Sequence, residues 1–76
     1  MNQARAEVLR LLGEPDEQIG SPNEPRAVEE NGYSWNEKWI HRGDATRIVL
    51  WNRYDLVGIF RVEGDGSWSP EPVLPE

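Results

Sequence analysis

The sequence predicts an α+β domain (α-β-β-β): one N-terminal helix packed on a three- to four-stranded antiparallel β-meander, with a long loop after the helix and an extended Pro-rich tail. Apolar residues recur at helical spacing near the N-terminus, and aromatic and β-branched runs fill residues 33–63. A segment rich in proline, glycine and acids separates them. With 76 residues and no internal repeat, we expect a single domain over residues 1–76.

The helix is expected over residues 2–12. Ala4 and Val8 belong to an apolar stripe at helical spacing. Gly13 suits the left-handed position that follows a helix, and Pro15 prevents its continuation. A helix of about three turns is marginal alone in water, so it must pack on a sheet.

The rest of the chain divides by composition. Residues 14–32 contain three prolines and two glycines among many acids, and we expect a surface loop there. Residues 33–63 contain the runs YSWNEKWI, ATRIVLWN and LVGIFRVE, which are typical of strands in a β-meander. Residues 64–76 are expected to form a turn, a possible short fourth strand and the tail.

The strands are expected to present two apolar faces. Hairpin loops of even length would place Trp39 opposite Thr46, and this register decides which residues share a face. The face expected to receive the helix carries Tyr33, Trp35, Trp39, Ile48, Leu50, Val57 and Ile59. The opposite face carries Ile40, Val49, Trp51, Leu56, Phe60 and Val62. The second face is too apolar for water and requires the tail through Trp68, Val73 and Leu74, a second copy of the chain, or a partner.

Composition excludes several classes of function. The chain has no cysteine, which excludes a disulfide framework, a thiolate zinc site and a cysteine nucleophile. The net charge of −6 repels polyphosphate, so we expect no nucleic-acid partner. No apolar run approaches the ~20 residues that span a bilayer, so we expect no transmembrane segment. Without a signal peptide or lipidation cysteine, a cytoplasmic location is expected, and an envelope location would require a trimmed precursor.

The titratable residues form no catalytic pattern. His41 is the only histidine, and Glu37 and Asp44 lie near it in the sequence. A general base can be imagined there, but no nucleophile or second histidine accompanies it. The tripeptide Arg-Gly-Asp over residues 42–44 suits a hairpin turn. We therefore predict no catalytic residue, no metal site and no cofactor, and a hydrolase built on His41 ranks last.

Three stretches together resemble a known family. They are EVLRLLGEPD (7–16), the aromatic strand YSWNEKWI (33–40) and the hairpin RIVLWNRYDLVGIF (47–60). Over about residues 4–62 the chain is similar to the SmpA/OmlA family, the BamE-like outer-membrane assembly lipoproteins. Leu12, Gly13 and Pro15 would match the helix end of that family. The resemblance implies a helix-on-sheet α+β domain that works by binding other proteins, a mode shared by the structurally similar β-lactamase inhibitor proteins.

Two functions follow as hypotheses. The first is a non-enzymatic protein-interaction module, as a homodimer or an adaptor, that uses the second sheet face or the acidic loop 14–32. Aromatic residues and arginine most often dominate binding energy, and the expected contact residues are Trp51, Phe60, Arg47 and Trp68. The alternative is a small-ligand or carbohydrate-binding domain in which the tryptophan rings stack on the ligand. That alternative uses Trp35 and Trp39, together with Trp51.

Overall fold

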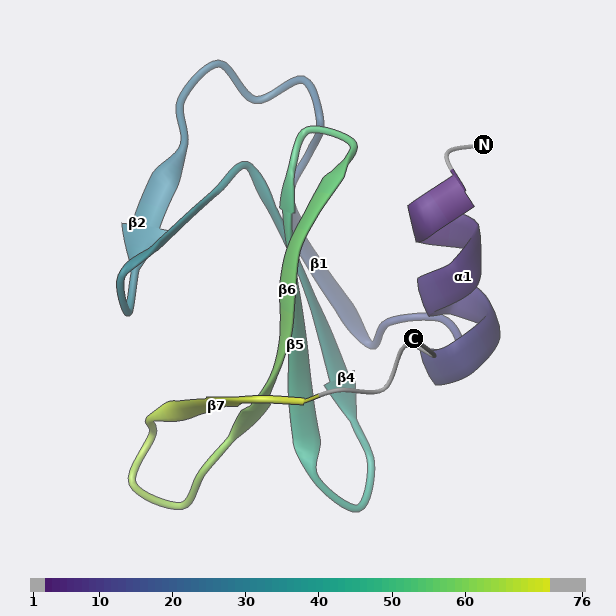
Figure 1. Cartoon of the computed structure of the whole chain (residues 1–76), viewed down its shortest axis with the longest axis vertical. Helices are drawn as coiled ribbons and strands as arrows, with labels where there is room; N and C mark the ends of the chain where they lie inside the picture. Colours follow the sequence, from purple (N-terminus) through teal and green to yellow (C-terminus); the bar gives the residue numbers. More distant parts are fainter. Residues whose placement is uncertain (1–2, 72–76) are drawn as a thin grey trace.

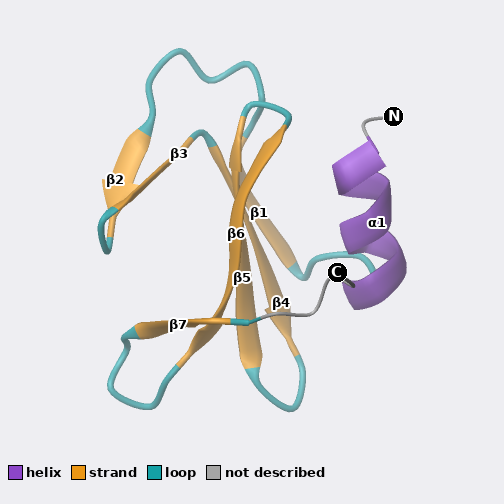
Figure 2. Ribbon diagram, in the orientation of Figure 1, coloured by secondary structure: helices purple, strands orange, loops and turns teal. Residues whose placement is uncertain are grey.

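The computed structural model describes residues 3–71, and it contains more strands than the sequence predicts (Figure 1). The helix is α1 (Gln3–Leu12), and the strands are β1 (Glu17–Gly20), β2 (Val28–Glu30), β3 (Tyr33–Trp35), β4 (Glu37–Arg42), β5 (Thr46–Asn52), β6 (Asp55–Val62) and β7 (Trp68–Pro70). A five-stranded antiparallel sheet has the order β1-β4-β5-β6-β7, and β2 and β3 form a separate hairpin. Figure 2 shows the large sheet between α1 on one side and the β2–β3 hairpin on the other.

The predicted fold class is therefore wrong in the number and connection of its strands. The expected loop 14–32 contains β1 and β2, and the first expected strand divides into β3 and β4. Both added strands are short and have low intrinsic β-propensity, because acids and amides dominate them. They form because they pair with β4 and β3, whose sequences are stronger strand formers. Tertiary pairing overrides local propensity in both cases.

The helix ends as the sequence predicts. The Gly13 N–H donates to the Leu9 carbonyl at 2.8 Å, and Gly13 adopts a φ of 78°. That left-handed conformation closes the last turn of α1 and is cheapest for glycine. The chain can then turn at once into β1, which places the C-terminal end of α1 beside the edge of the sheet.

Asn36 separates β3 from β4 and is buried. Its N–H donates to the Trp51 carbonyl at 2.8 Å, and its own carbonyl accepts from the Ser21 N–H at 3.2 Å. Its side-chain amide donates to the Glu24 carbonyl at 3.2 Å. Because these bonds fix the bend, β4 stays in the large sheet while β3 leaves it and carries Trp35 over the other face.

The two faces of the sheet are grouped differently from the prediction. Trp39 lies opposite Val49, not Thr46, and the register of β5 against β6 shifts between Leu50 and Trp51. The connection between β4 and β5 has three residues, 43–45, and an odd loop moves every side chain of the next strand to the other face. The face under α1, called the helix face, carries Trp39, Val49, Trp51 and Ile59 around Val8, with Ala4, Leu9, Leu12 and Leu56 against them.

The opposite face, called the hairpin face, is also apolar and is covered by the same chain. Its buried residues are Ile48, Leu50 and Phe60, packed with Trp35 from the β2–β3 hairpin. Tyr33, Ile40, Val57, Val62 and Trp68 pack around them. Trp68 contributes to this cover as the sequence suggested, while Val73 and Leu74 lie outside the described residues. No helix within residues 3–71 is long and apolar enough to cross a membrane.

Candidate functional site

The side chains expected to form a contact surface lie mostly in the core. Trp51 is fully buried beneath α1, and Phe60 is buried beneath the β2–β3 hairpin. Trp68 is half-buried and stacks on Phe60, with 5.6 Å between the ring centroids. The structure places these residues on two opposite faces, so it does not bring them together as one exposed surface.

Arg47 reaches the surface but is engaged there. Its guanidinium donates to the Asp44 carboxylate at 3.1 Å and to the Glu71 carboxylate at 3.0 Å. The hydrogen bond and charge of Arg47 lower the pKa of Asp44. Hydrogen bonds to Asp44 and, to a smaller extent, to Glu71 raise the pKa of Arg47. At the end of β4, Arg42 donates to Glu17 of β1 at 2.8 Å. The Arg-Gly-Asp tripeptide thus covers the end of β4 and the start of the β4–β5 turn, and both of its charged side chains form ion pairs.

The tryptophans expected to stack on a ligand are covered by the protein itself. Trp35 and Trp39 are both buried. The Arg5 guanidinium lies 5.4 Å from the Trp39 ring, and the Lys38 ammonium lies 5.1 Å from the Trp35 ring. The faces that a sugar would need are therefore occupied by cationic side chains of the same chain.

His41 forms no ion pair with a carboxylate in residues 3–71. Its Nε2 lies 3.0 Å from the Gly13 carbonyl oxygen, which can only accept, so Nε2 carries the proton. The Glu37 carboxylate instead accepts from Arg5 and Trp39, and Asp44 pairs with Arg47. The free lone pair is on Nδ1, which is buried without a hydrogen-bond partner among the described residues. A general base in this position could not reach a substrate.

A hollow of about 250 Å³ lies beside His41, and its lining residues are Leu12, Glu14, Asp16, His41, Arg42, Gly43, Ala45 and Arg47. The two arginines in this lining, Arg42 and Arg47, are already paired with acids. Within residues 3–71, no group of three or more histidine, cysteine or carboxylate side chains could hold a metal ion.

The outer edge of β1, called the β1 edge, is the exposed feature that the sequence did not place. β1 is the first strand of the large sheet and, among residues 3–71, pairs only with β4; all four of its residues are exposed. Residues 3–71 expose three large apolar side chains, and Ile19 on β1 (38 % exposed) and Val28 on β2 (46 % exposed) are two of them. An exposed strand edge with apolar side chains beside it is a template for another strand.

The hydrogen-bond pattern shows which residues of β1 direct their backbone groups outward. The Ser21 N–H donates to the Asn36 carbonyl, and this pair continues the β1–β4 register. Hydrogen-bonded pairs alternate along an antiparallel ladder, so Glu17, Ile19 and Ser21 bond toward β4. Gln18, in the middle of the strand, and Gly20, at its end, consequently direct their N–H and C=O groups away from the sheet. These are the groups that an added strand would meet.

The segment that carries the β1 edge is strongly acidic. Residues 14–32 contain six acids against one arginine, a net charge of −5 in a chain whose total is −6. Glu17 pairs with Arg42 and Glu30 pairs with Lys38. Across the part of the chain that the structure describes, no salt bridge involves Glu14, Glu24 or Glu29, and all three side chains are exposed. The β1 edge therefore lies in a negative field.

Comparison of the chain with protein-family models, with curated proteins and with solved structures finds no match. The resemblance to the SmpA/OmlA family stays a prediction.

Proposed function

We propose that this chain is a non-enzymatic protein-binding module that pairs an extended segment of a partner with the β1 edge. The observation that carries the proposal is that all four residues of β1 are exposed and that Gln18 directs its backbone N–H and C=O outward. Strand addition to a free edge is a recurring mode of peptide recognition, in which main-chain bonds supply affinity and side-chain contacts supply specificity. The acidic segment 14–32, one of the two surfaces suggested by the sequence, contains this edge.

The size of the edge supports a transient interaction. β1 has only four residues, and each hydrogen bond that an added strand makes is worth about 0.5–1.5 kcal/mol net. Burial of Ile19 would add apolar contact on one side of the new strand. Interfaces below about 1,200 Å² are typical of weak and short-lived complexes. The resemblance to the SmpA/OmlA family implies the same class of function, a domain that works by binding other proteins.

The other hypotheses have less support. A carbohydrate site would need exposed indole faces, and Trp35 and Trp39 are buried. A hydrolase would need an accessible base, and the Nδ1 atom of His41 is buried. A dimer formed through the second sheet face would need that face uncovered, and the β2–β3 hairpin lies on it. The β1 edge needs no such rearrangement.

The experiment uses the variant Gln18→Pro with Gln18→Thr as its matched control. Proline removes the outward N–H but none of the bonds to β4, and such a residue is tolerated on an edge strand. Random peptides of about seven residues, a usual strand length, are displayed and selected on the wild-type protein. We expect the selected peptides to bind Gln18→Thr like the wild type and Gln18→Pro at least about tenfold more weakly.

Two further measurements complete this test. Circular dichroism must show that both variants keep the fold of the wild type. Amide ¹⁵N chemical shifts should change on peptide binding mainly within residues 16–21. Peptides that bind Gln18→Pro as tightly as the wild type, or a selection that yields no peptide, would overturn the proposal.

A further inference from the structure

We infer that the segment received by the β1 edge is basic, with lysine or arginine on both sides of an apolar residue that packs beside Ile19. This inference rests on the proposed strand addition and names the chemistry of the partner. The inference is based on two observations: the face of the sheet on which Ile19 lies, and the acidic side chains around the β1 edge.

The side chains of β1 alternate between the two faces of the sheet. Ile19 lies opposite Lys38, and directly opposed residues share a face. The Lys38 ammonium lies over the Trp35 ring, so Ile19 belongs to the hairpin face. Val28 lies opposite Trp35 in the β2–β3 hairpin and turns toward the same side. A partner residue opposite Ile19 would meet apolar surface on this side, which favours a β-branched or aromatic side chain there.

Acids that form no salt bridge within residues 3–71 flank the edge at both ends. Glu14 and Asp16 precede β1, and Glu24 follows it in the connection to β2. The Asp16 carboxylate accepts the backbone N–H of Arg42 at 2.5 Å, which leaves its charge without a cationic partner in residues 3–71. The Glu24 N–H donates to the Ser21 carbonyl at 3.2 Å, so the chain turns immediately after the strand and keeps Glu24 near its end. Cationic side chains of an added strand would meet these carboxylates.

The same charges disfavour a second copy of the chain as the occupant. Antiparallel pairing of two β1 edges would bring together two segments, each with six acids and one arginine. Their repulsion acts over roughly 8 Å at physiological ionic strength, a range longer than the spacing between paired strands. A basic strand converts this repulsion into attraction and is also steered toward the edge. The surface therefore fits a basic partner better than itself.

The test compares three capped peptides of about seven residues that alternate valine with lysine, with threonine or with glutamate. Binding is measured by amide ¹⁵N shifts at about 0.01 M and about 0.15 M salt, where the Debye lengths are roughly 30 and 8 Å. We expect the lysine peptide to bind about tenfold more tightly than the threonine peptide at low salt. The glutamate peptide should be the weakest. The preference for lysine should shrink at the higher salt concentration.

Charge variants localise the effect. The double variant Glu14→Gln/Glu24→Gln should weaken binding of the lysine peptide and leave the threonine peptide unchanged. Asp65→Asn is the control for position, because it removes one carboxylate charge, against two in the double variant, in the turn before β7 at the opposite edge of the large sheet. It should leave both affinities close to those of the wild type. Gln18→Pro should weaken every peptide that binds at the β1 edge.

The outcomes separate this inference from the proposed function. Equal binding of the lysine and threonine peptides at the β1 edge would overturn the charge inference alone and leave strand addition standing. Selected peptides that bind at this edge but carry no basic residues would do the same. Sedimentation equilibrium that shows a dimer lost in Gln18→Pro would identify a second copy as the occupant. Binding of no peptide in either experiment would overturn both.

Discussion

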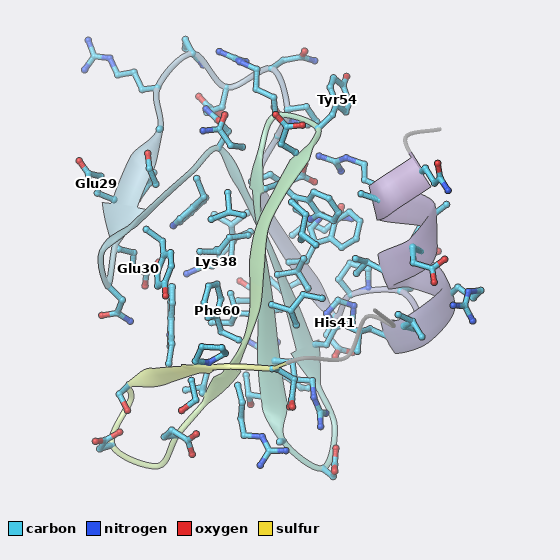
Figure 3. All side chains as sticks on the ribbon, viewed as in Figure 1. Glu29, Glu30, Lys38, His41, Tyr54 and Phe60 are labelled. Atoms are coloured by element: carbon cyan, nitrogen blue, oxygen red, sulfur yellow. The ribbon has the colours of Figure 1, made fainter. Side chains whose placement is uncertain are left out.

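Each face of the sheet is covered through a cation, a tryptophan ring and a carboxylate, but the elements that supply them are exchanged. On the helix face the cation comes from the covering helix: Arg5 of α1 lies 4.7 Å from the Trp51 ring and 2.5 Å from the Glu37 carboxylate of the sheet. On the hairpin face the cation comes from the sheet. Lys38 lies 5.1 Å from the Trp35 ring and 2.9 Å from Glu30, and both of these residues belong to the hairpin; Figure 3 labels Lys38 and Glu30.

The difference between the two arrangements is their access to water. The Arg5 and Glu37 side chains are only 12 % and 7 % exposed, whereas Glu30 is 39 % exposed. A shielded ion pair depends on both of its partners, because removal of one leaves an uncompensated buried charge. A solvated ion pair contributes little. The helix is therefore attached partly through charge, and the hairpin mainly through aromatic area.

Replacement of Trp35 by alanine should produce the largest effect. Trp35 is buried between the hairpin and the sheet, and loss of a buried tryptophan costs about 3–5 kcal/mol. Urea unfolding followed by circular dichroism measures the change. The control is Val8→Ala, which removes the fully buried contact of α1 and should cost about 2 kcal/mol. An equal loss of unfolding free energy in both variants would contradict the view that buried aromatic area contributes more to attaching the hairpin than buried apolar area contributes to attaching α1.

Replacement of Glu37 by glutamine should cause the second-largest loss of unfolding free energy. The change keeps the shape of the side chain but removes the charge that faces Arg5, and a buried hydrogen bond to a charged group is worth about 1.5–3 kcal/mol. The Arg5 guanidinium retains its bond to the Arg53 carbonyl and its contact with Trp51, so the domain should still fold. Thermal unfolding at two salt concentrations should give nearly the same loss, because a shielded pair is poorly screened.

Replacement of Glu30 by glutamine should have the smallest effect. The chemical change is the same as in Glu37→Gln, but the pair with Lys38 is partly solvated. The expected loss is below about 1 kcal/mol and should decrease further when salt is added. The two variants are compared under identical unfolding conditions. A loss as large as that of Glu37→Gln would mean that the hairpin also depends on its ion pair.

Part of this fold could be predicted from sequence because it follows from local rules. The end of α1 depends on Gly13, whose conformation is governed by its own backbone. The apolar character of both sheet faces also follows from the sequence, since β5 contains no polar residue between Ile48 and Trp51. These properties are independent of register. They remain valid although the pairing of β4 with β5 differs from the expected one.

The sequence contains a turn signal for one of the elements that was not predicted, the β2–β3 hairpin. Asn31 and Gly32 adopt φ angles of 51° and 84°, and two successive positive values define the two-residue turn that best joins antiparallel strands. The Asn-Gly pair before YSW therefore predicts the β2–β3 hairpin. Residues 14–32 were expected to form a loop because acids and prolines surround this pair. β1 had no such indication, because it exists only through its pairing with β4.

The candidate site could be predicted only in part. The acidic segment 14–32 was identifiable from composition, but its free backbone groups were not. The outward direction of Gln18 follows from the hydrogen bond between Ser21 and Asn36, which are fifteen positions apart in the sequence. The predicted contact residues Trp51 and Phe60 are buried because the strand β3, placed by the bend at Asn36, and the helix cover both faces. Composition does not determine which surfaces are covered.

Gly20 imposes a limit on anything that joins the sheet at β1. Its φ is +80°, and a Cβ at this position would lie 2.2 Å from the Asn36 carbonyl oxygen, so no other residue fits without a shift of the backbone. The strand stops here and the chain turns away. A segment added at this edge would therefore find no further β1 backbone to pair with beyond Gly20. Such a boundary would select short linear motifs by length as well as by composition, and a longer ligand would project beyond it unbound.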